Sequence, residues 1–546
     1  MKIALAQLNY HIGNFESNTA KIIKAIQEAK AKEADLVVFA ELAICGYPPR
    51  DFLEFTEFIE LTEKAVAEIA EASKGIACII GAPTKNPRIK GKDLFNSAYF
   101  IEDGEIKQVI NKALLPTYDV FDEYRYFEPN TEFSCITYKG VKIALTICED
   151  LWNINDNPLY ISSPMEELIK EEPDLMINIA ASPFSYNHDD NRYKVLSDNS
   201  SKYELPLLYV NQVGAQTEIV FDGGSFVFNE KGQLLDQLEY FKEDLKVYEF
   251  QDGEIIGLNP IEYKPSPDVK QIHDALILGI QDYFYKSGFS KAVLGLSGGI
   301  DSAVVCALAA EALGPQNVLA VLMPSKYSTD HSIKDAVDLA ENLGCKHEVV
   351  AIKEITDAFD HVLAPSFKGL PFNVAEENIQ ARSRAVIVMA FSNKFGYVLL
   401  NTSNKSEAAV GYGTLYGDMA GAISVLGDVY KTQVYELARY INREREIIPE
   451  SSIVKPPSAE LRPGQKDSDS LPDYDVLDKL LYQYIELKKS SRDIIAAGFD
   501  EELVKRVIKM VNKAEFKRYQ TPPILRVSPK AFGMGRRMPI VGKYLS

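Results

Sequence analysis

The stretch AVLGLSGGIDSAVVCALAAEAL, residues 292–313, constrains the fold more than any other part of the chain. Residues 292–296 form a short, branched apolar run that is typical of a buried strand. The run breaks at Ser297-Gly298-Gly299, and an Ala- and Leu-rich helix is predicted from about Asp301. Such a helix start presents unpaired backbone N–H groups and the positive end of the helix dipole, which together favour a bound phosphate.

This glycine loop is not a Walker loop, because no Lys follows the glycines. Its form, SGGxDS, resembles the pyrophosphate-binding loop of the adenine-nucleotide α-hydrolase-like enzymes, which adenylate a substrate and release pyrophosphate. That resemblance implies that Asp301 holds Mg²⁺, a hard ion that keeps several waters and bridges phosphates. The alternative is an ordinary glycine turn between a strand and a helix. The full six-residue pattern in this context favours the phosphate site.

The overall composition narrows the class of protein. With 546 residues the chain is too long for one hydrophobic core, so two or more domains are expected. A net charge of −19 argues against a nucleic-acid partner, which would need clustered Lys and Arg. The six cysteines are scattered without a CxxC pair, and no apolar run reaches the length of a membrane span. We therefore expect a cytoplasmic protein with reduced thiols and neither a nucleic-acid nor a membrane partner.

Three reactive side chains in residues 1–263 follow predicted strands. Glu41 follows LVVFA, Lys112 follows QVIN and Cys148 follows VKIALTI. Because strand ends converge at one edge of a sheet, these groups are expected to meet there. A thiolate can then attack, a carboxylate relay the proton and an ammonium stabilise the oxyanion. The alternative for each residue alone is ordinary: a core Cys, or a solvated Lys.

The segments around these residues resemble those of the nitrilase, or carbon–nitrogen hydrolase, superfamily. The matching segments are FAELAICGYPPRD, NKALLPTYDVFDEYRYFEP and LTICEDLW. The resemblance implies a four-layer αββα sandwich with Glu41 as general base, Lys112 as oxyanion stabiliser and Cys148 as nucleophile. It also makes Glu123 the family's second glutamate, which orients the Lys.

The glutaminase branch of that superfamily suggests where L-glutamine binds. Tyr118, in LPTYDVF, and Ser182, in ASPFSYNHDDNR, match residues that contact the substrate. His188 stands six positions after Ser182, where the branch has a basic residue, and Arg192 is a nearby alternative for the same contact.

The segment YKPSPD carries two prolines and no periodicity, so it marks an interdomain boundary. We accordingly predict one domain over residues 1–263 and a second over residues 264–546. In the second domain, buried apolar strands alternate with helices, which is the pattern of a doubly wound parallel sheet. Ligands bind outside the carboxyl ends of such strands, which places MPSKYSTDHS beside SGGIDS over one nucleotide.

Further segments of the second domain resemble the NAD synthetase family. They are EENIQARSR, NTSNKSEAAVGYGTLYGDMAG, GDVYKTQVYELA and KPPSAELRPGQKD, with Ser403 in place of a family glycine. The resemblance places Mg²⁺ at Asp301 and Glu407. It places deamido-NAD⁺ at Asn378, Glu407 and a C-terminal basic residue, Arg526 or, as the second choice, Lys530. It implies that ATP contacts Gly295, Leu296, Ser297, Gly298, Gly299, Ile300, Asp301, Ser302, Thr402, Lys431 and Ser458.

Together the two resemblances imply an enzyme that amidates deamido-NAD⁺ through an acyl-adenylate, with ATP as co-substrate and ammonia taken from glutamine. We also expect a homo-oligomer. One alternative is a metabolite sensor, but a sensor has no need of the Glu41, Lys112 and Cys148 set. A second is another SGGxDS amidotransferase with a different acceptor, such as a precursor of GMP or asparagine. The segments EENIQARSR and SEAAVGYGTLYGDMAG argue against that acceptor.

Overall fold

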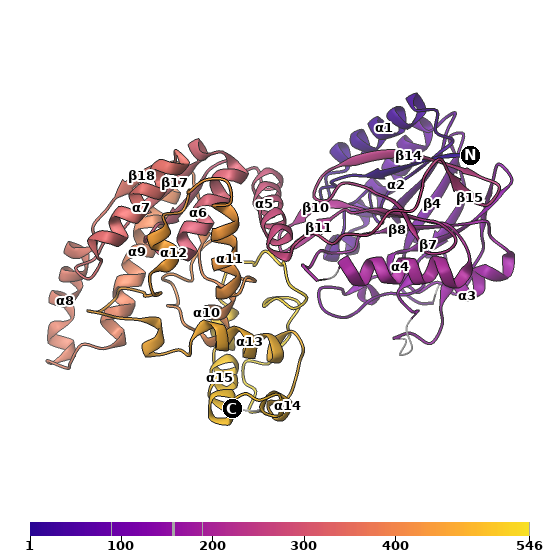
Figure 1. Cartoon of the computed structure of the whole chain (residues 1–546). Coiled ribbons are helices and arrows are strands. Elements are labelled where there is room, and N and C mark those ends of the chain that lie inside the picture. Colours follow the sequence, from indigo (N-terminus) through magenta and orange to yellow (C-terminus); the bar gives the residue numbers. More distant parts are fainter. Residues whose placement is uncertain (89, 155–158, 188, 545–546) are drawn as a thin grey trace. The chain divides into compact units, whose positions relative to one another are not determined.

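The computed structural model describes residues 1–88, 90–154, 159–187 and 189–544. It divides into two compact units, Met1–Ser266 and Pro267–Ser546 (Figure 1). The sequence predicted the boundary three residues earlier, at the start of the proline-containing segment. None of the helices in the described ranges combines the length and the apolar composition that crossing a bilayer would require.

The first unit contains two large sheets. The seven-stranded sheet has the order β15-β14-β1-β2-β3-β4-β5. Its strands are β1 (Lys2–Gln7), β2 (Leu36–Val38), β3 (Ala77–Lys85), β4 (Leu94–Glu102), β5 (Glu105–Asn111), β14 (Asp244–Gln251) and β15 (Glu254–Ile256). The six-stranded sheet has the order β13-β12-β9-β8-β7-β6. Its strands are β6 (Ile136–Tyr138), β7 (Val141–Ile147), β8 (Leu175–Ala180), β9 (Leu207–Asn211), β12 (Phe226–Phe228) and β13 (Leu234–Gln237). A separate ribbon pairs β10 (Val213–Gln216) with β11 (Ile219–Asp222).

Alternation along the strands separates the layers of this unit. In β2, Leu36 and Val38 join a core shared with the six-stranded sheet, whereas Val37 packs into a second core on the opposite face. That second core also holds the buried residues of α1 (Phe15–Ala31) and α2 (Thr56–Ala72). Residues of α3 (Pro164–Leu168) and α4 (Asp189–Tyr203) join the core of the six-stranded sheet. The predicted αββα sandwich is confirmed.

The second unit is built on a parallel sheet of order β18-β17-β16-β19-β20. Its strands are β16 (Ala292–Gly295), β17 (Val318–Leu322), β18 (Lys346–Val349), β19 (Val398–Asn401) and β20 (Ile423–Ser424). The chain moves outward from β16 to β17 and β18 and then returns to the other side of β16 as β19. The strand order therefore reverses at β16, and ligands of doubly wound sheets bind at such a switch point. The predicted parallel sheet is confirmed.

Helices cover this sheet and extend it toward the C-terminus. The helices α6 (Ile300–Leu313), α7 (Asp330–Leu343) and α9 (Val374–Phe395) pack on the strands. Against α6 pack α5 (Asp268–Lys286), α11 (Lys431–Ile441) and α12 (Glu450–Val454), and against α9 packs α8 (Lys353–Phe367). The short helix α10 (Lys405–Val410) packs on helices nearer the C-terminus. A further core includes residues of α10 and of α13 (Tyr474–Ile485), α14 (Ser491–Ala496) and α15 (Glu501–Lys513), which α16 (Glu515–Arg518) follows. Residues 303–310 of α6 are fully buried, which fixes the loop at its N-terminus.

Candidate functional site

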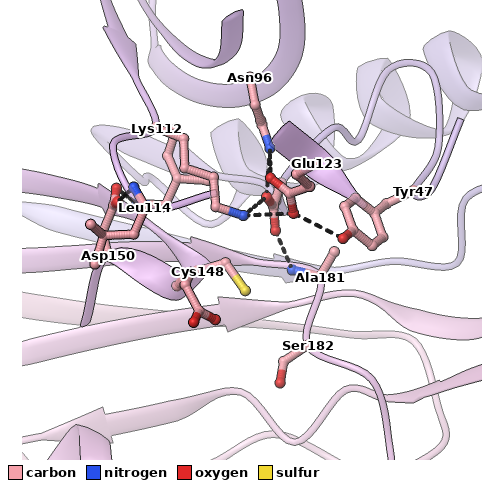
Figure 2. Close-up of polar contacts among 12 residues, drawn as sticks. Tyr47, Asn96, Lys112, Leu114, Glu123, Cys148, Asp150, Ala181 and Ser182 are labelled. Carbon is pink, nitrogen blue, oxygen red and sulfur yellow. Dashed lines mark hydrogen bonds and ion pairs between the residues drawn. The ribbon is translucent and has the colours of Figure 1, made fainter. Parts of the chain in front are cut away.

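The three reactive side chains of the first unit come from both sheets of the sandwich. Glu41 lies three residues beyond β2, and Lys112 is the first residue after β5, both in the seven-stranded sheet. Cys148 follows β7 of the six-stranded sheet. The expectation that all three meet at the edge of a single sheet is therefore wrong. The sandwich brings them together because the two sheets face each other (Figure 2).

Lys112 is the centre of this cluster. Its buried ammonium donates to Glu41 Oε1 at 2.7 Å and to Glu123 Oε1 at 2.8 Å. Burial lowers the pKa of Lys112, but the Glu123 and Glu41 carboxylates outweigh that effect and hold the pKa well above its usual value. Burial in turn raises the pKa of Glu123 to about 7, against the effect of Lys112. The lysine is thus a fixed cation between two carboxyl groups.

Three further groups, which the sequence did not reveal, hold the two carboxylates in place. Asn96 Nδ2 donates to Glu41 Oε1 at 2.7 Å and to Glu123 Oε2 at 3.3 Å. The backbone N–H of Ala181 donates to Glu41 Oε2 at 3.0 Å, and the Tyr47 hydroxyl donates to Glu123 Oε1 at 2.9 Å (Figure 2). Every carboxylate oxygen of the pair therefore accepts a hydrogen bond.

Cys148 stands at a sharp bend between β7 and a short 3₁₀ helix, Cys148–Leu151. Its φ of 45° lies in the left-handed region, which non-glycine residues seldom occupy and which is common at functional sites. In Figure 2 its sulfur points toward the side of the cluster that holds the Lys112 ammonium. Burial and the Glu41 carboxylate raise the pKa of the thiol well above its usual value, while Lys112 acts in the opposite direction. The resting thiol keeps its proton, so attack needs a base.

The two acidic residues after Cys148 have separate roles. Asp150 Oδ1 accepts from the backbone N–H groups of Ala113 and Leu114, and its Oδ2 accepts from Ile147. It thereby joins the chain after Lys112 to the end of β7. Burial raises the pKa of Asp150 to about 6.

Glu149 is buried directly after Cys148 and is hydrogen-bonded to Tyr118, which is predicted to contact the substrate. The Tyr118 hydroxyl donates to both carboxylate oxygens, at 2.9 and 3.0 Å, and the Tyr160 hydroxyl donates at 3.1 Å. Burial raises the pKa of Glu149 to about 7. No role was assigned to Glu149 from the sequence. Its position directly after Cys148 is the signal that could have singled it out.

The other residues predicted to bind the substrate glutamine are Ser182 and a cation, either His188 or Arg192. Ser182 is buried next to Ala181, and its backbone N–H donates to Asn211 Oδ1 at 2.8 Å. His188 lies outside the described residues. The guanidinium of Arg192 is buried and forms two bonds to Asp222, of 2.9 and 2.5 Å, so this alternative cation is already engaged inside the unit.

The second unit has a cavity of about 320 Å³ beyond the end of β16. Most of the predicted nucleotide residues line it, namely Gly295, Leu296, Ser297, Gly299, Ile300, Asp301, Ser302, Thr402, Glu407, Lys431 and Ser458. Four predicted residues are not among the described residues that line this cavity, namely Gly298, Asn378, Arg526 and the second-choice Lys530.

Gly298 contributes through its backbone. Its φ is +79°, and a Cβ at this position would lie 2.1 Å from the carbonyl oxygen of Ser332 at the start of α7. Only glycine fits, because any side chain would push the loop away from α7. The hydroxyls of Ser297 and Ser302 lie 3.1 Å apart and brace the same turn.

Lys431 joins two carboxylates inside the cavity. Its ammonium lies 2.5 Å from Asp301 Oδ2 and 3.4 Å from Glu407 Oε1, and Asn404 Nδ2 donates to Asp301 Oδ1 at 2.9 Å. Burial raises the pKa of Glu407 to about 8, with Lys431 opposing and Asp301 assisting the shift.

The convergence of Asp301 and Glu407 fits Mg²⁺, which takes one or two carboxylates together with waters and substrate phosphates. The described ranges contain no group of three or more His, Cys, Asp or Glu side chains that could hold a metal by themselves. A magnesium ion here would therefore need the nucleotide's own oxygens.

The residues predicted to bind deamido-NAD⁺ form hydrogen bonds within the second unit. Asn378 Oδ1 accepts from the Thr414 hydroxyl at 2.7 Å. Arg526 donates to the carbonyls of Ser528 and Pro529, at 3.1 and 2.9 Å. The backbone carbonyl of Lys530 accepts from the buried ammonium of Lys405 at 3.0 Å.

Comparison with known proteins agrees with this arrangement. Residues 2–257 match the carbon–nitrogen hydrolase family, and residues 272–521 match the NAD synthase family. A glutamine-dependent NAD(+) synthetase from Synechocystis sp. is 48% identical over 98% of each chain, and one from Acinetobacter baylyi is 43% identical over 99% of this chain and 98% of its own. The structure of such an enzyme from Acinetobacter baumannii, in complex with ADP, is 40% identical with a TM-score of 0.79, covering 99% of this chain and 98% of its own. The chain thus belongs to the glutamine-dependent NAD(+) synthetases.

Proposed function

We propose that this protein makes NAD⁺ from deamido-NAD⁺, ATP and L-glutamine, releasing AMP, pyrophosphate and glutamate. The observation that carries the proposal is the presence of two chemically different sites in one chain. One is the buried Glu41–Lys112–Cys148 cluster, and the other is the SGGIDS cavity at the switch point of the parallel sheet. The first suits hydrolysis of an amide, and the second suits activation of a carboxylate by a nucleotide.

Release of ammonia begins with attack of the Cys148 sulfur on the carboxamide carbon of glutamine. Glu41 accepts the thiol proton as the bond forms, which the raised thiol pKa requires, and then gives a proton to the departing ammonia. The Lys112 ammonium stabilises the negative charge on the carbonyl oxygen. Water then hydrolyses the thioester to glutamate. Glu123 touches Lys112 rather than substrate, so it positions the lysine.

Recognition of glutamine involves Tyr118, Ser182 and Glu149. A buried carboxylate beside the nucleophile suits the α-ammonium of an amino acid, because the two opposite charges attract strongly where water is excluded. Glu149 therefore binds that ammonium, and Tyr118 and Ser182 supply hydroxyls. His188 is the candidate for the glutamine α-carboxylate.

Activation of the acceptor takes place in the cavity of the second unit. The carboxylate of deamido-NAD⁺ attacks the α-phosphorus of ATP, pyrophosphate leaves, and ammonia displaces AMP from the resulting acyl-adenylate. Adenylation is needed because hydroxide is a very poor leaving group. Backbone N–H groups of the SGGIDS loop at the N-terminus of α6 hold phosphate oxygens. Thr402, Lys431 and Ser458 complete the ATP site.

Asp301 and Glu407 hold Mg²⁺, which neutralises phosphate charge when it is bound with ATP. Glu407 also contacts deamido-NAD⁺, together with Asn378 and Arg526, or with Lys530 as the alternative to Arg526. Lys431 lies between these two carboxyl groups, where its ammonium would also be available to a phosphate oxygen of the bound nucleotide.

The protein forms a homo-oligomer through α8 and α9. Helix α8 has no buried residue, although Ile355, Phe359 and Val362 form one apolar stripe along it, with 38%, 44% and 70% of each residue exposed. On α9, Val386 and Met389 are 70% and 40% exposed. An apolar face of this extent on both helices is covered by a second copy of the chain. The compartment is the cytoplasm, where the six free cysteines remain reduced.

Sedimentation tests the oligomer directly. The combined substitution Val362→Glu and Val386→Glu should give a monomer, because it places two charges in the apolar contact. Lys353→Gln, an exposed change at the start of α8, should leave the assembly intact. A wild-type chain that sediments as a monomer at micromolar concentration would contradict the assignment.

The proposed reaction is tested with the purified chain, Mg²⁺, ATP and deamido-NAD⁺, with either glutamine or ammonium as nitrogen source. We expect NAD⁺ and AMP in equal amounts with both sources, and glutamate only with glutamine. Cleavage of ATP to ADP and phosphate, or glutamine hydrolysis without NAD⁺ under all conditions, would refute the proposed function.

A further inference from the structure

A basic side chain of α9 enters the nucleotide cavity, and none of the roles above uses it. Arg384 lines the cavity together with residues of the SGGIDS loop. Its Nε donates to the backbone carbonyl of Met323 at 3.0 Å, just beyond the end of β17. This bond fixes the base of the guanidinium at the carboxyl edge of the sheet. An arginine has four more N–H hydrogens to satisfy.

The cavity holds two other cations, and carboxylates of the protein already engage both. Lys431 lies between Asp301 and Glu407. Lys455 donates to Ser332 Oγ at 3.1 Å and lies 3.6 Å from Asp335.

Arg384 differs from these lysines in its charge environment. Across the described residues, no carboxylate oxygen lies within ion-pair distance of its guanidinium. Burial lowers the pKa of Arg384, and the carboxylates of Asp418 and Glu460 oppose that effect from a greater distance. A guanidinium remains charged even so. The structure therefore keeps a partly buried positive charge, with N–H donors that no described carboxylate accepts, at the wall of a cavity.

A partly buried guanidinium without a partner anion loses solvation free energy, and a bound anion would offset that loss. A charge removed from water is normally paired, and a planar fork of N–H donors matches the oxygens of a phosphate. The cavity is otherwise rich in acidic groups, with Asp301, Glu407, Asp418, Glu460 and Asp467 in its wall. A polyphosphate entering it would meet repulsion from these carboxylates, and Arg384 is placed to offset that repulsion.

We infer that Arg384 binds a phosphate group of the nucleotide in this cavity and is a determinant of ATP affinity. This inference rests on the proposed function, because it takes ATP as the occupant. It assigns the guanidinium to a phosphate rather than to the adenine base or the ribose. It also explains why α9 is anchored to the end of β17 through a side chain of this length and charge.

The test compares binding of ATP and of adenosine to the full-length protein by calorimetry. Arg384→Gln removes the charge but keeps a hydrogen-bond donor. It should weaken ATP binding roughly 10- to 100-fold, the usual value of a hydrogen bond to a charged group, and leave adenosine affinity unchanged. Arg384→Lys should recover part of the loss, because the charge is restored without the fork. Lys394→Gln, an exposed change near the end of the same helix, is the matched control.

Two results would overturn the inference. One is equal weakening of ATP and adenosine by Arg384→Gln, which would indicate contact with the nucleoside or a distorted pocket. The other is unchanged ATP affinity in Arg384→Gln. Both are distinct from failure of the proposed function, in which the wild-type chain itself would not bind ATP. Unchanged adenosine affinity serves as the folding check, because adenosine binds in the unit that carries Arg384, whereas glutamine hydrolysis would report only on the other unit.

Discussion

At the scale of single residues, Lys112 is the most constrained charge of the glutaminase site. Its side chain and that of Glu41 are fully buried, and Glu123 is only 5% exposed. Removing one member of such a buried ion group leaves an uncompensated charge and costs about 3–5 kcal/mol. In the intact site, hydrogen bonds from Asn96, Tyr47 and Ala181 to the carboxylate oxygens offset the free-energy cost of burying these charges. The site is thus preorganised for charge that develops on the substrate.

Glu149 gives a prediction about pH. Because burial raises its pKa to about 7, the carboxyl is protonated and neutral below that pH and ionised above it. Only the ionised form attracts the α-ammonium of glutamine. The KM for glutamine should therefore rise as the pH falls through 7. In Glu149→Gln the KM should be high, roughly tenfold or more, and independent of pH over the same range.

Steady-state glutamine hydrolysis between pH 5.5 and 8.5 measures this effect. Glu105→Gln, an exposed change at the start of β5, is the control and should follow the wild type. If Glu149→Gln keeps the wild-type pH dependence of KM, Glu149 does not bind the ammonium.

Sequence reasoning identified the reactive residues but not the groups that hold them. Glu41, Lys112, Glu123 and Cys148 stand in segments that resemble a known family, so their roles could be predicted. Asn96 lies inside β4, and its amide is one polar group among many along the chain. That it reaches both glutamates depends on the pairing of β4 in the folded sheet, which no local pattern encodes.

At the scale of elements, the turn between β16 and α6 sets the geometry of the nucleotide site. The buried face of α6 fixes the helix, and the close approach of Gly298 to Ser332 fixes the loop against α7. The backbone N–H groups that would hold phosphate are therefore positioned by packing rather than by the ligand.

Gly298→Ala tests this element. The new Cβ would collide with the Ser332 carbonyl, displace the loop and abolish NAD⁺ formation with either nitrogen source, while basal glutamine hydrolysis persists. The control is Gly288→Ala, where φ is also positive, +73°, but no atom lies within 4 Å of the new Cβ. The control should lose only about 1–2 kcal/mol of stability and keep its activity. Equal activity of the two variants would show that the loop tolerates displacement.

Many helices and strands could be predicted from hydrophobic periodicity and from turn-forming residues, but the way in which they pack together could not. The strand and the helix expected within residues 292–313 are present as β16 and α6. Glu41, Lys112 and Cys148, the proposed catalytic residues, were in contrast expected at one sheet edge and are supplied by two sheets. Alternation of apolar and polar residues along a strand indicates that one face of the strand is buried, but it does not indicate which sheet covers that face.

At the scale of the whole molecule, two units with separate cores carry complementary half-reactions. Free ammonia released to water at neutral pH becomes mostly ammonium, which is a poor nucleophile. Fusion of the two units is useful if ammonia reaches the acyl-adenylate without mixing with solvent. We therefore predict that glutamine amide nitrogen enters NAD⁺ directly.

Isotope labelling measures this transfer. With ¹⁵N-amide glutamine and an excess of unlabelled ammonium at a pH where free ammonia is scarce, NAD⁺ should carry mostly ¹⁵N. Dilution of the label to the level of the bulk pool would exclude direct transfer. Binding of ATP and deamido-NAD⁺ should also accelerate glutamine hydrolysis, by a factor within the usual allosteric range of roughly 5- to 150-fold.

We propose that Cys148 releases ammonia from glutamine for a synthetase unit that does not itself need the thiol, and Cys148→Ala is the variant that separates the two activities. The measurement is the rate of NAD⁺ formation with glutamine and, separately, with ammonium as the nitrogen source. Cys135→Ala, at a half-exposed thiol of the same unit, is the control and should match the wild type with both sources. We predict that Cys148→Ala forms no NAD⁺ from glutamine and forms it from ammonium at close to the wild-type rate. Equal loss of both activities in a folded variant, or normal use of glutamine, would contradict it.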